Sequence, residues 1–118
     1  ATMAATIANS GVNPVTKKEV FKPELTPKIA SMMATVGFYE HTGDWLFTTG
    51  LPAKTGVGGG IMGVVAGVMG VAAFAPPLDE AGNSVKAQKA LAFIAGHLNL
   101  NLFGTTRCVM AEKEPVQA

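Results

Sequence analysis

A lysine, a hydroxyl residue and a glycine follow one another at Lys54-Thr55-Gly56, and this order could serve chemistry on a carbonyl group. If the triplet lies on a β-strand, Lys54 and Gly56 share one face and Thr55 takes the other, because successive side chains alternate. The backbone N–H of Val57 is then available as an oxyanion donor. A lone triplet is a weak signal, since an ordinary lysine before a glycine turn has the same letters.

Glycines at position 56 and at 58–60 would let a substrate approach the backbone closely. Two phosphate-binding interpretations of the run Gly50–Ile61 fail. A dinucleotide-binding fingerprint would need a third glycine where Ile61 stands, and a P-loop would need Gly-Lys-Ser/Thr after its spacer. The run therefore does not support a phosphate-binding loop.

A nucleophile for such a site is not evident in the sequence. A serine is activated well by a lysine three residues on, which lies one helical turn away and can take its proton. Each of the three serines is followed three positions later by another residue type: Asn13 after Ser10, Ala34 after Ser31 and Ala87 after Ser84. The single cysteine, Cys108, lies in a polar segment without a nearby histidine and is expected to be inert.

Other polar residues do not suggest a second site. Asp79 and Glu80 are adjacent, which favours a solvated turn over a catalytic carboxylate pair. Only two histidines are present, His41 and His97, so no metal cluster is expected. His97 is predicted to be a surface residue favoured by the dipole at a helix end.

Two helices are predicted ahead of the triplet. The apolar, alanine-rich run 1–8 reads as a helix entered partway that stops near Asn9–Gly11. A second helix is expected to begin with Thr26 as N-cap and Pro27 at its first position, and to end at Gly37. Helical spacing of apolar residues predicts one buried face on it, formed by Ile29, Met32, Met33 and Val36.

The middle of the chain is predicted to form about three antiparallel strands joined by tight connections. A turn at Thr42–Asp44 precedes a predicted short strand over Trp45–Thr49, rich in aromatic and β-branched residues. Further strand signals surround Lys54, run from Ile61 to Val65, and span Val68–Phe74. Pro76 and Pro77 would close the sheet.

A last helix is predicted after the loop at 78–84, capped by Asn83 or Ser84. Its apolar residues are expected to pack on the sheet, namely Ala87, Ala90, Leu91, Ile94 and Leu98. After Gly104 the composition turns polar, which predicts a loose tail.

Length and charge limit the alternatives. A chain of 118 residues forms at most one domain, and nine basic against eight acidic side chains favour neither a nucleic-acid surface nor a polybasic membrane patch. The uncharged run 55–78 is long enough for a transmembrane helix, with glycine pairs at helix-packing spacing. Seven glycines between positions 56 and 70 favour strands instead.

Three strings in this order, Gly37–Trp45, Gly50–Ile61 and Pro76–Val85, resemble the C-terminal part of the serine-dependent glutaminases. The Lys-Thr-Gly triplet also lines the active-site strand of serine β-lactamases and penicillin-binding proteins. The resemblance implies a β-lactamase-like α/β (α+β) fold and hydrolysis of L-glutamine to L-glutamate and ammonia. Residues 1–103 would be the C-terminal portion of one catalytic domain, and residues 104–118 a polar tail.

The resemblance also implies roles for single residues. Taken alone, Tyr39 would be a half-buried aromatic whose hydroxyl finds some partner. By resemblance it lies in the active site, beside the nucleophile and the bound glutamine, and could donate to the substrate or relay a proton. Val57 would supply a backbone oxyanion donor, while Lys54, Thr55 and Gly56 would support the site from behind. Thr55 stands where the family usually has serine.

The attacking serine would come from chain upstream, so the sequence is expected to be a piece of a longer protein that is inactive by itself. The resemblance implies a dimer or tetramer, no cofactor, no metal, and a bacterial cytoplasmic or mitochondrial location. It implies neither a nucleic-acid nor a membrane partner. Two other classes stay open: a non-catalytic module that binds glutamine or a partner, and a glycine-rich membrane or assembly element.

Overall fold

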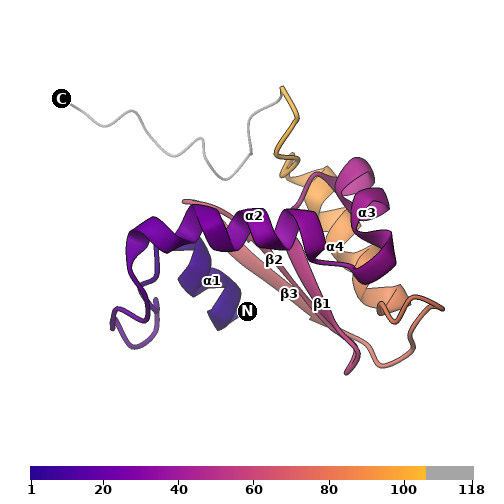
Figure 1. The fold of residues 1–118 in the computed structure, drawn as a ribbon, viewed down its shortest axis with the longest axis horizontal. Helices are drawn as coiled ribbons and strands as arrows, with labels where there is room; N and C mark the ends of the chain where they lie inside the picture. The colour runs from indigo at the N-terminus through magenta and orange to yellow at the C-terminus, as the bar shows by residue number, and fades with distance from the viewer. Residues whose placement is uncertain (106–118) are drawn as a thin grey trace.

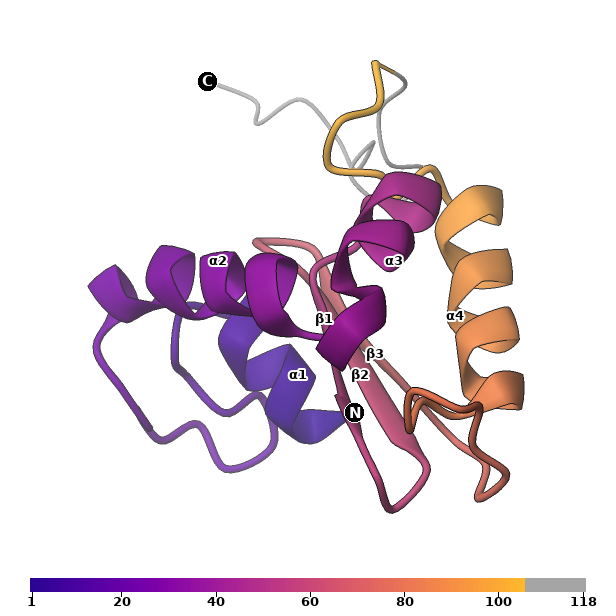
Figure 2. The ribbon, with the colours of Figure 1, turned by 45° about the vertical axis from the view of Figure 1, so that its right-hand side comes forward.

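The structure, a computed structural model, describes residues 1–105. In this part of the chain, helices lie on both sides of one antiparallel sheet (Figures 1 and 2). The elements are α1 (Thr2–Ala8), α2 (Thr26–Val36), α3 (Thr42–Thr49), α4 (Val85–His97), β1 (Ala53–Gly56), β2 (Gly60–Val65), β3 (Met69–Phe74) and the short 3₁₀ helices η1 (Pro23–Leu25) and η2 (Tyr39–His41). The predicted fold class, strands packed against helices, is confirmed.

The sheet has the order β1-β2-β3, and both pairs of strands are antiparallel. The register places Gly56 opposite Gly60 and Gly60 opposite Phe74. Gly67 has φ +76° at the turn between β2 and β3, a conformation that glycine adopts without strain. The alternative of a transmembrane helix over 55–78 is therefore wrong. Among residues 1–105, no helix is both long and apolar enough to cross a membrane.

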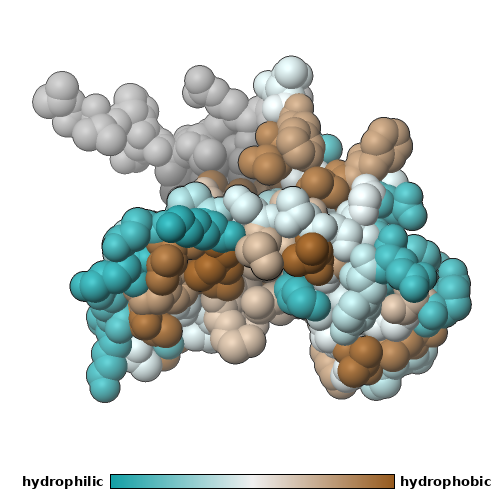
Figure 3. All heavy atoms as spheres, in the orientation of Figure 1, coloured by the Kyte–Doolittle hydropathy of each residue, from teal (hydrophilic) through white to brown (hydrophobic). Residues whose placement is uncertain are grey.

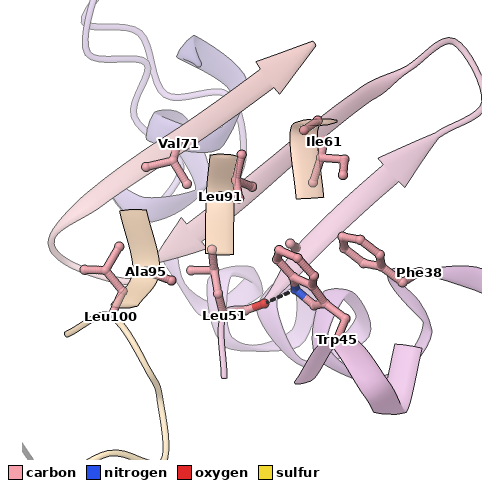
Figure 4. Close-up of a cluster of buried hydrophobic side chains, with 10 residues drawn as sticks. Phe38, Trp45, Leu51, Ile61, Val71, Leu91, Ala95 and Leu100 are labelled. Atoms are coloured by element: carbon pink, nitrogen blue, oxygen red, sulfur yellow. Dashed lines mark hydrogen bonds between the residues drawn. The ribbon is translucent and has the colours of Figure 1, made fainter. Parts of the chain in front are cut away.

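The side of the sheet covered by α3 and α4, called the closed side below, holds a continuous core. Figure 4 shows the Trp45 ring beside Phe38. The two rings are stacked, with centroids 4.4 Å apart and planes 7° from parallel. The Trp45 indole N–H donates to the Leu51 carbonyl at 2.8 Å. The remaining core residues come from the sheet, from α4 and from the segment after it: Ala53, Ile61, Val71, Ala87, Leu91, Ala95 and Leu100.

The side covered by α1 and α2, called the open side, is less complete. Its buried cluster consists of Ala4, Ile7, Ala8, Met33 and Val64. Met32 is 61% exposed and Val36 56% exposed, although both were predicted to lie on a buried helix face with Met33. Figure 3 shows apolar surface over α1 and α2. The four-residue buried face predicted for α2 is thus formed by Met33, with partly buried Ile29, but not by Met32 and Val36.

The strand predicted at Trp45–Thr49 is wrong, because these residues form most of α3. The helix ends at Gly50, whose φ of +60° gives a left-handed cap and whose N–H donates to the Leu46 carbonyl at 2.8 Å. The predicted turn at Thr42–Asp44 is the first turn of this helix. Burial of Trp45 against Phe38 decides the local structure against the strand propensity of the residues.

Two smaller predictions about helices also need correction. Thr26 begins α2 rather than capping it, and its buried hydroxyl has no hydrogen-bond partner among residues 1–105. On α4, Ala90 is exposed, whereas Ala95 is buried in its place. Ser84, as predicted, caps α4 by accepting a hydrogen bond from the Ala87 N–H at 3.2 Å.

Candidate functional site

β1 carries the Lys-Thr-Gly triplet with the predicted alternation. Ala53 and Thr55 are buried on the closed side, whereas Lys54 and Gly56 are partly exposed and point to the other face. The Thr55 N–H donates to the Gly37 carbonyl at 3.0 Å, which joins the triplet directly to the end of α2. Thr55 thus anchors the strand, and Lys54 is the charged side chain that the strand presents.

Lys54 reaches Tyr39. Its ammonium nitrogen lies 4.9 Å from the centroid of the Tyr39 ring and donates to the Thr55 carbonyl at 2.6 Å. A cation over an aromatic face at this distance is attracted by the ring's quadrupole, a contact worth about 0.5–1 kcal/mol at an exposed site. The predicted half-buried aromatic is therefore a 45%-exposed ring that lies against the triplet.

Tyr39 has an unusual backbone. Its φ is +53°, in the left-handed region that side-chain-bearing residues rarely adopt. It begins η2, and its carbonyl accepts a hydrogen bond from the Thr42 hydroxyl at 2.8 Å. Such a conformation costs on the order of 1–3 kcal/mol and persists where surrounding contacts over-determine it. Positive φ in a tyrosine is a reason to suspect a functional position.

Val57 follows β1 directly, outside the paired register that ends at Gly56 and Gly60. Among residues 1–105, its backbone N–H donates to no carbonyl or side chain. Its side chain is 69% exposed. This N–H can therefore serve a ligand, which is the property that an oxyanion donor needs.

Gly82 shows how close Val57 and Tyr39 are. A Cβ built on Gly82 would lie 3.7 Å from both Val57 Cγ1 and Tyr39 Cε2, so the two side chains flank the same backbone point. Gly82 has φ +92°, which a larger residue could not adopt without strain. The structure thus brings Tyr39, Lys54 and Val57 together at one end of β1, and it adds Gly82, which the sequence did not single out.

A hollow of about 670 Å³ lies on the open side next to this cluster. Lys54 and Gly56 form part of its wall, and the rest comes from the N-terminus of α1 and from β2 and β3, including Met3, Met62 and Phe74. Nothing lies within 4 Å of the point where a Cβ on Gly56 would stand, so the backbone there is accessible. Tyr39 and Val57 do not line this hollow.

The polar groups considered as nucleophiles do not complete the site. The Ser31 hydroxyl donates to the Pro27 carbonyl at 2.7 Å within α2, and the buried Ser84 hydroxyl donates to the Ala75 carbonyl at 2.7 Å. Cys108 lies outside the described residues. His97 is exposed at the end of α4 and stacks on Phe93, with ring centroids 5.6 Å apart. Within residues 1–105, no group of three or more His, Cys, Asp or Glu side chains could hold a metal ion.

Asp79 has a structural task instead of a catalytic one. Its carboxylate accepts hydrogen bonds from the backbone N–H of Asn83 at 2.9 Å, the Gln88 amide at 3.0 Å and the Ala81 N–H at 3.0 Å. The Asn83 N–H first, then the Gln88 amide and the Ala81 N–H, hold the pKa of this carboxyl below its ordinary value. Asp79 thus organises the loop that carries Gly82 and Asn83, while Glu80 is exposed.

An antiparallel sheet with helices on both sides, and with Lys-Thr-Gly on an outer strand, defines a portion of a β-lactamase-like fold. The family model of the glutaminases matches residues 1–103. A glutaminase of Bacteroides fragilis is 66% identical over 109 residues, which cover 92% of this chain and 34% of that protein. Glutaminase 1 of Escherichia coli is 53% identical over 103 residues, covering 87% and 33%.

Solved structures agree with these matches. A probable glutaminase superimposes with a TM-score of 0.85 at 53% identity, over 87% of this chain and 33% of that one. A Bacillus subtilis glutaminase, in a covalent complex with 5-oxo-L-norleucine formed by reaction with 6-diazo-5-oxo-L-norleucine, gives 0.79 at 29% identity, over 86% and 37%. The chain therefore belongs to the glutaminase family. It spans about a third of the length of the curated relatives it matches, and corresponds to their C-terminal part.

Proposed function

We propose that residues 1–103 are the C-terminal portion of a glutaminase catalytic domain, followed by a polar tail at 104–118. The completed enzyme hydrolyses L-glutamine to L-glutamate and ammonia. One observation carries this proposal: in a chain of the glutaminase family, Tyr39, Lys54 and the backbone N–H of Val57, which has no partner among residues 1–105, meet at one end of β1.

In the proposed reaction, a serine from the remaining chain attacks the side-chain amide carbon of glutamine. The tetrahedral oxyanion accepts hydrogen bonds from the serine's own N–H and from the Val57 N–H, ammonia leaves, and water releases glutamate from the acyl-enzyme. The covalent complex of the Bacillus subtilis relative supports a protein nucleophile in this family. The Tyr39 hydroxyl donates a hydrogen bond to the substrate or relays a proton.

The Lys-Thr-Gly triplet supports the Tyr39 ring and the Val57 N–H. The Lys54 ammonium holds the Tyr39 ring by a cation–π contact, and Thr55 fixes β1 in the closed core. Gly56 keeps the backbone before Val57 accessible. No metal or cofactor enters the proposed reaction.

The remaining two thirds of the catalytic domain dock, in this proposal, on the open side. Apolar side chains stay exposed there around Lys54 and the 670 Å³ hollow, namely Met3, Met32, Val36 and Phe74. An apolar surface of this kind, beside an incomplete site, is what a chain leaves when its covering partner is absent. The completed domain is proposed to act in the bacterial cytoplasm as a dimer or tetramer, as the family resemblance implies.

The experiment that tests the function compares this chain alone with the same chain joined to the upstream two thirds of the Bacteroides fragilis glutaminase. Release of ammonia and glutamate from L-glutamine is measured for both. We expect turnover from the joined protein and none above background from the chain alone. Turnover by the chain alone would show that the nucleophile lies within it and would overturn the proposed division.

The oxyanion role of Val57 is tested in the joined protein. Val57→Pro removes the N–H, and the expected loss is about 10²–10³ in kcat, since one donor contributes roughly 3 kcal/mol. Val57→Ala keeps the N–H and is the matched control, for which a far smaller loss is expected. Equal losses in the two variants would exclude a backbone role. Tyr39→Phe, which keeps the ring over Lys54, isolates the hydroxyl.

A second candidate function is a non-catalytic module that binds glutamine. The exposed Tyr39 and Val57 favour it, since no Ser-x-x-Lys pair stands in this sequence. Calorimetric titration of the chain with L-glutamine separates this module from the proposed enzyme portion. We expect no heat of binding from the chain alone, because it spans only about a third of the length of its curated relatives.

A further inference from the structure

We propose that Asn83 is a positioning residue for Tyr39. With Thr42, it fixes the peptide groups on both sides of Tyr39 and so keeps this residue in the left-handed backbone conformation that places its ring beside Lys54 and Val57. The catalytic part of this inference rests on the proposed glutaminase function. The structural part does not.

Asn83 makes the longest-range side-chain hydrogen bond at the site. Its side chain is fully buried, and its Nδ2 donates to the Phe38 carbonyl at 3.3 Å, across 45 positions of sequence. This carbonyl belongs to the peptide group directly before Tyr39. Asn83 is itself held by Asp79, which accepts from the Asn83 N–H at 2.9 Å and donates its own N–H to the Asn83 carbonyl at 2.8 Å.

Thr42 fixes the same segment from the other side. Its hydroxyl accepts a hydrogen bond from the Phe38 N–H at 3.0 Å and donates to the Tyr39 carbonyl at 2.8 Å. The Gly37 carbonyl, one residue earlier, accepts from the Thr55 N–H of β1 at 3.0 Å. The carbonyls of residues 37, 38 and 39 thus accept hydrogen bonds from Thr55, Asn83 and Thr42 respectively. The Phe38 carbonyl also accepts one from the nearby His41 N–H at 3.1 Å.

These contacts explain why a tyrosine keeps φ at +53°. The strain of on the order of 1–3 kcal/mol needs compensating contacts, and hydrogen bonds to buried carbonyls supply them. The contacts also connect the phenol ring to its surroundings: the loop that ends in Asn83 contains Gly82, over which the ring and Val57 meet. Moving Asn83 would therefore move the backbone of Tyr39 and the point between Tyr39 and Val57 together.

A merely structural asparagine would be expected to satisfy both ends of its amide. Asn83 does not, because its buried Oδ1 has no hydrogen-bond partner among residues 1–105. An unpaired buried acceptor is unfavourable by about 1–3 kcal/mol. Within residues 1–105, the one side-chain hydrogen bond that Asn83 makes is therefore the bond from Nδ2 to the Phe38 carbonyl.

The structural test uses the 118-residue chain, in which Tyr39 is the only tyrosine, so isotope-labelled tyrosine gives one set of NMR signals. At positive φ the amide and α protons of one residue lie close together, and we expect a strong nuclear Overhauser effect between them, with ring contacts to Lys54 and Val57. Asn83→Ala and Asn83→Asp should lose these signals. Their persistence in both variants, or their absence from the unmodified chain, would overturn the proposal.

Ser84→Ala is the matched control. Ser84 is adjacent to Asn83, is also fully buried, and caps α4, but its hydroxyl bonds to Ala75 and Ala87 and not to the segment 37–39. We expect this variant to lower stability while leaving the Tyr39 signals in place. If Asn83 variants do not fold, Thr42→Val and Thr42→Ser decide instead: valine should abolish the left-handed signature, and serine, which keeps the hydroxyl, should restore it. Equal Tyr39 NMR signals in the Thr42→Val and Thr42→Ser variants would refute the proposal.

The catalytic test uses the chain joined to the upstream part of the Bacteroides fragilis relative, at a temperature where every variant is folded. We expect Asn83→Ala to lower kcat for L-glutamine about tenfold to a hundredfold, because a misplacement near 1 Å has effects of this size, and Ser84→Ala to lower it less than twofold. Equal losses would make Asn83 merely structural. If the unmodified joined protein does not hydrolyse glutamine, the proposed function fails, and the NMR result alone decides whether Asn83 positions Tyr39.

Discussion

The two sides of the sheet differ in how completely they are covered. On the closed side, α3 and α4 bury a continuous set of large residues, among them Phe38, Leu51 and Leu91, each fully buried. On the open side, α1 and α2 cover only part of the sheet, and Met32 and Phe74 stay exposed beside Lys54. The closed side is therefore covered by this chain alone, whereas the open side keeps apolar surface exposed.

The proposed site lies where these two sides meet. Thr55 points into the closed core, whereas Lys54, next to it, points to the open side and contacts Tyr39. A rigid strand backed by a packed core can hold a charged side chain and a backbone N–H in place for a partner that arrives from the other side. Stability and the proposed chemistry are thus supplied by opposite faces of one strand.

The largest effect should separate the two sides directly. Leu91→Ala empties a fully buried position in the closed core, and a loss of about 2–5 kcal/mol in the free energy of unfolding is expected. Met32→Ala, on the open side, should change it by at most about 0.5 kcal/mol. Urea unfolding followed by circular dichroism measures both. Similar losses in both variants would mean that the open side is buried in solution, for example by self-association.

A somewhat smaller effect is expected where α2 meets β1. A Cβ on Gly37 would overlap the carbonyl oxygens of Ala53 and Met33, so Gly37→Ala should cost about 1–3 kcal/mol by overpacking. Gly43→Ala, inside α3 with nothing within 4 Å of its Cβ, is the control and should stabilise by roughly 0.5–1 kcal/mol. Thermal unfolding of both variants tests this pair. A neutral Gly37 variant would show that the junction can move.

The hydrogen bond from Trp45 to Leu51 tests the polar part of the closed core. Trp45→Phe keeps a ring against Phe38 but leaves the buried Leu51 carbonyl without the indole donor, which should cost about 1–2 kcal/mol. Phe47→Ala on the exposed face of α3 is the control and should cost less than about 0.5 kcal/mol. Denaturant midpoints report both, and a larger cost at Phe47 would contradict the assignment of faces.

The smallest effect concerns pH. Hydrogen bonds from Asn83, Gln88 and Ala81 lower the pKa of Asp79 in the folded chain. A lowered folded pKa contributes stability that is present above the ordinary value, about 3.9, and is lost as pH falls through the folded value. Asp79→Asn should therefore be less stable than the unmodified chain at pH 7, by a few tenths of a kcal/mol after solvent screening. The difference should fade below about pH 4.

Glu80→Gln is the control for this pH experiment, because the exposed Glu80 side chain makes no hydrogen bond within residues 1–105. Stability curves for the three proteins between pH 2 and pH 7 measure the effect. A gap between Asp79→Asn and the unmodified chain that grows as pH falls would have the wrong sign and would refute the role of the Asp79 carboxylate.

Several features of the fold follow from local sequence. Glycine, proline and small polar residues mark the ends of α1, the β2–β3 turn and the cap of α4, because these positions require particular backbone angles or hydrogen bonds. The alternation of Lys54 and Thr55 follows from strand geometry alone. A place for Tyr39 in the active site was inferred from the family resemblance and from no local pattern, and its contact with Lys54 was not predicted.

α3 was not predictable from propensity, because its aromatic and threonine residues favour a strand. The helix-stop signal was nonetheless present at Gly50, followed by Pro52, and would have favoured a helix. The prediction of a four-residue buried face on α2, at the open side, was wrong for another reason. Helical spacing identifies an apolar face of α2, yet only contacts decide whether that face is covered, and Met32 and Val36 have none that bury them here.

By itself, the sequence determined the three strands of the sheet, the β2–β3 turn and the residue types at the end of β1, since these depend on backbone sterics and side-chain alternation between near neighbours. The tertiary structure decided which of those residues meet. The bond from Asn83 to the peptide before Tyr39 joins positions 45 apart, and the Tyr39 ring meets Lys54 of β1. No local rule encodes such a pairing, because it arises only when the sheet and its helices have packed.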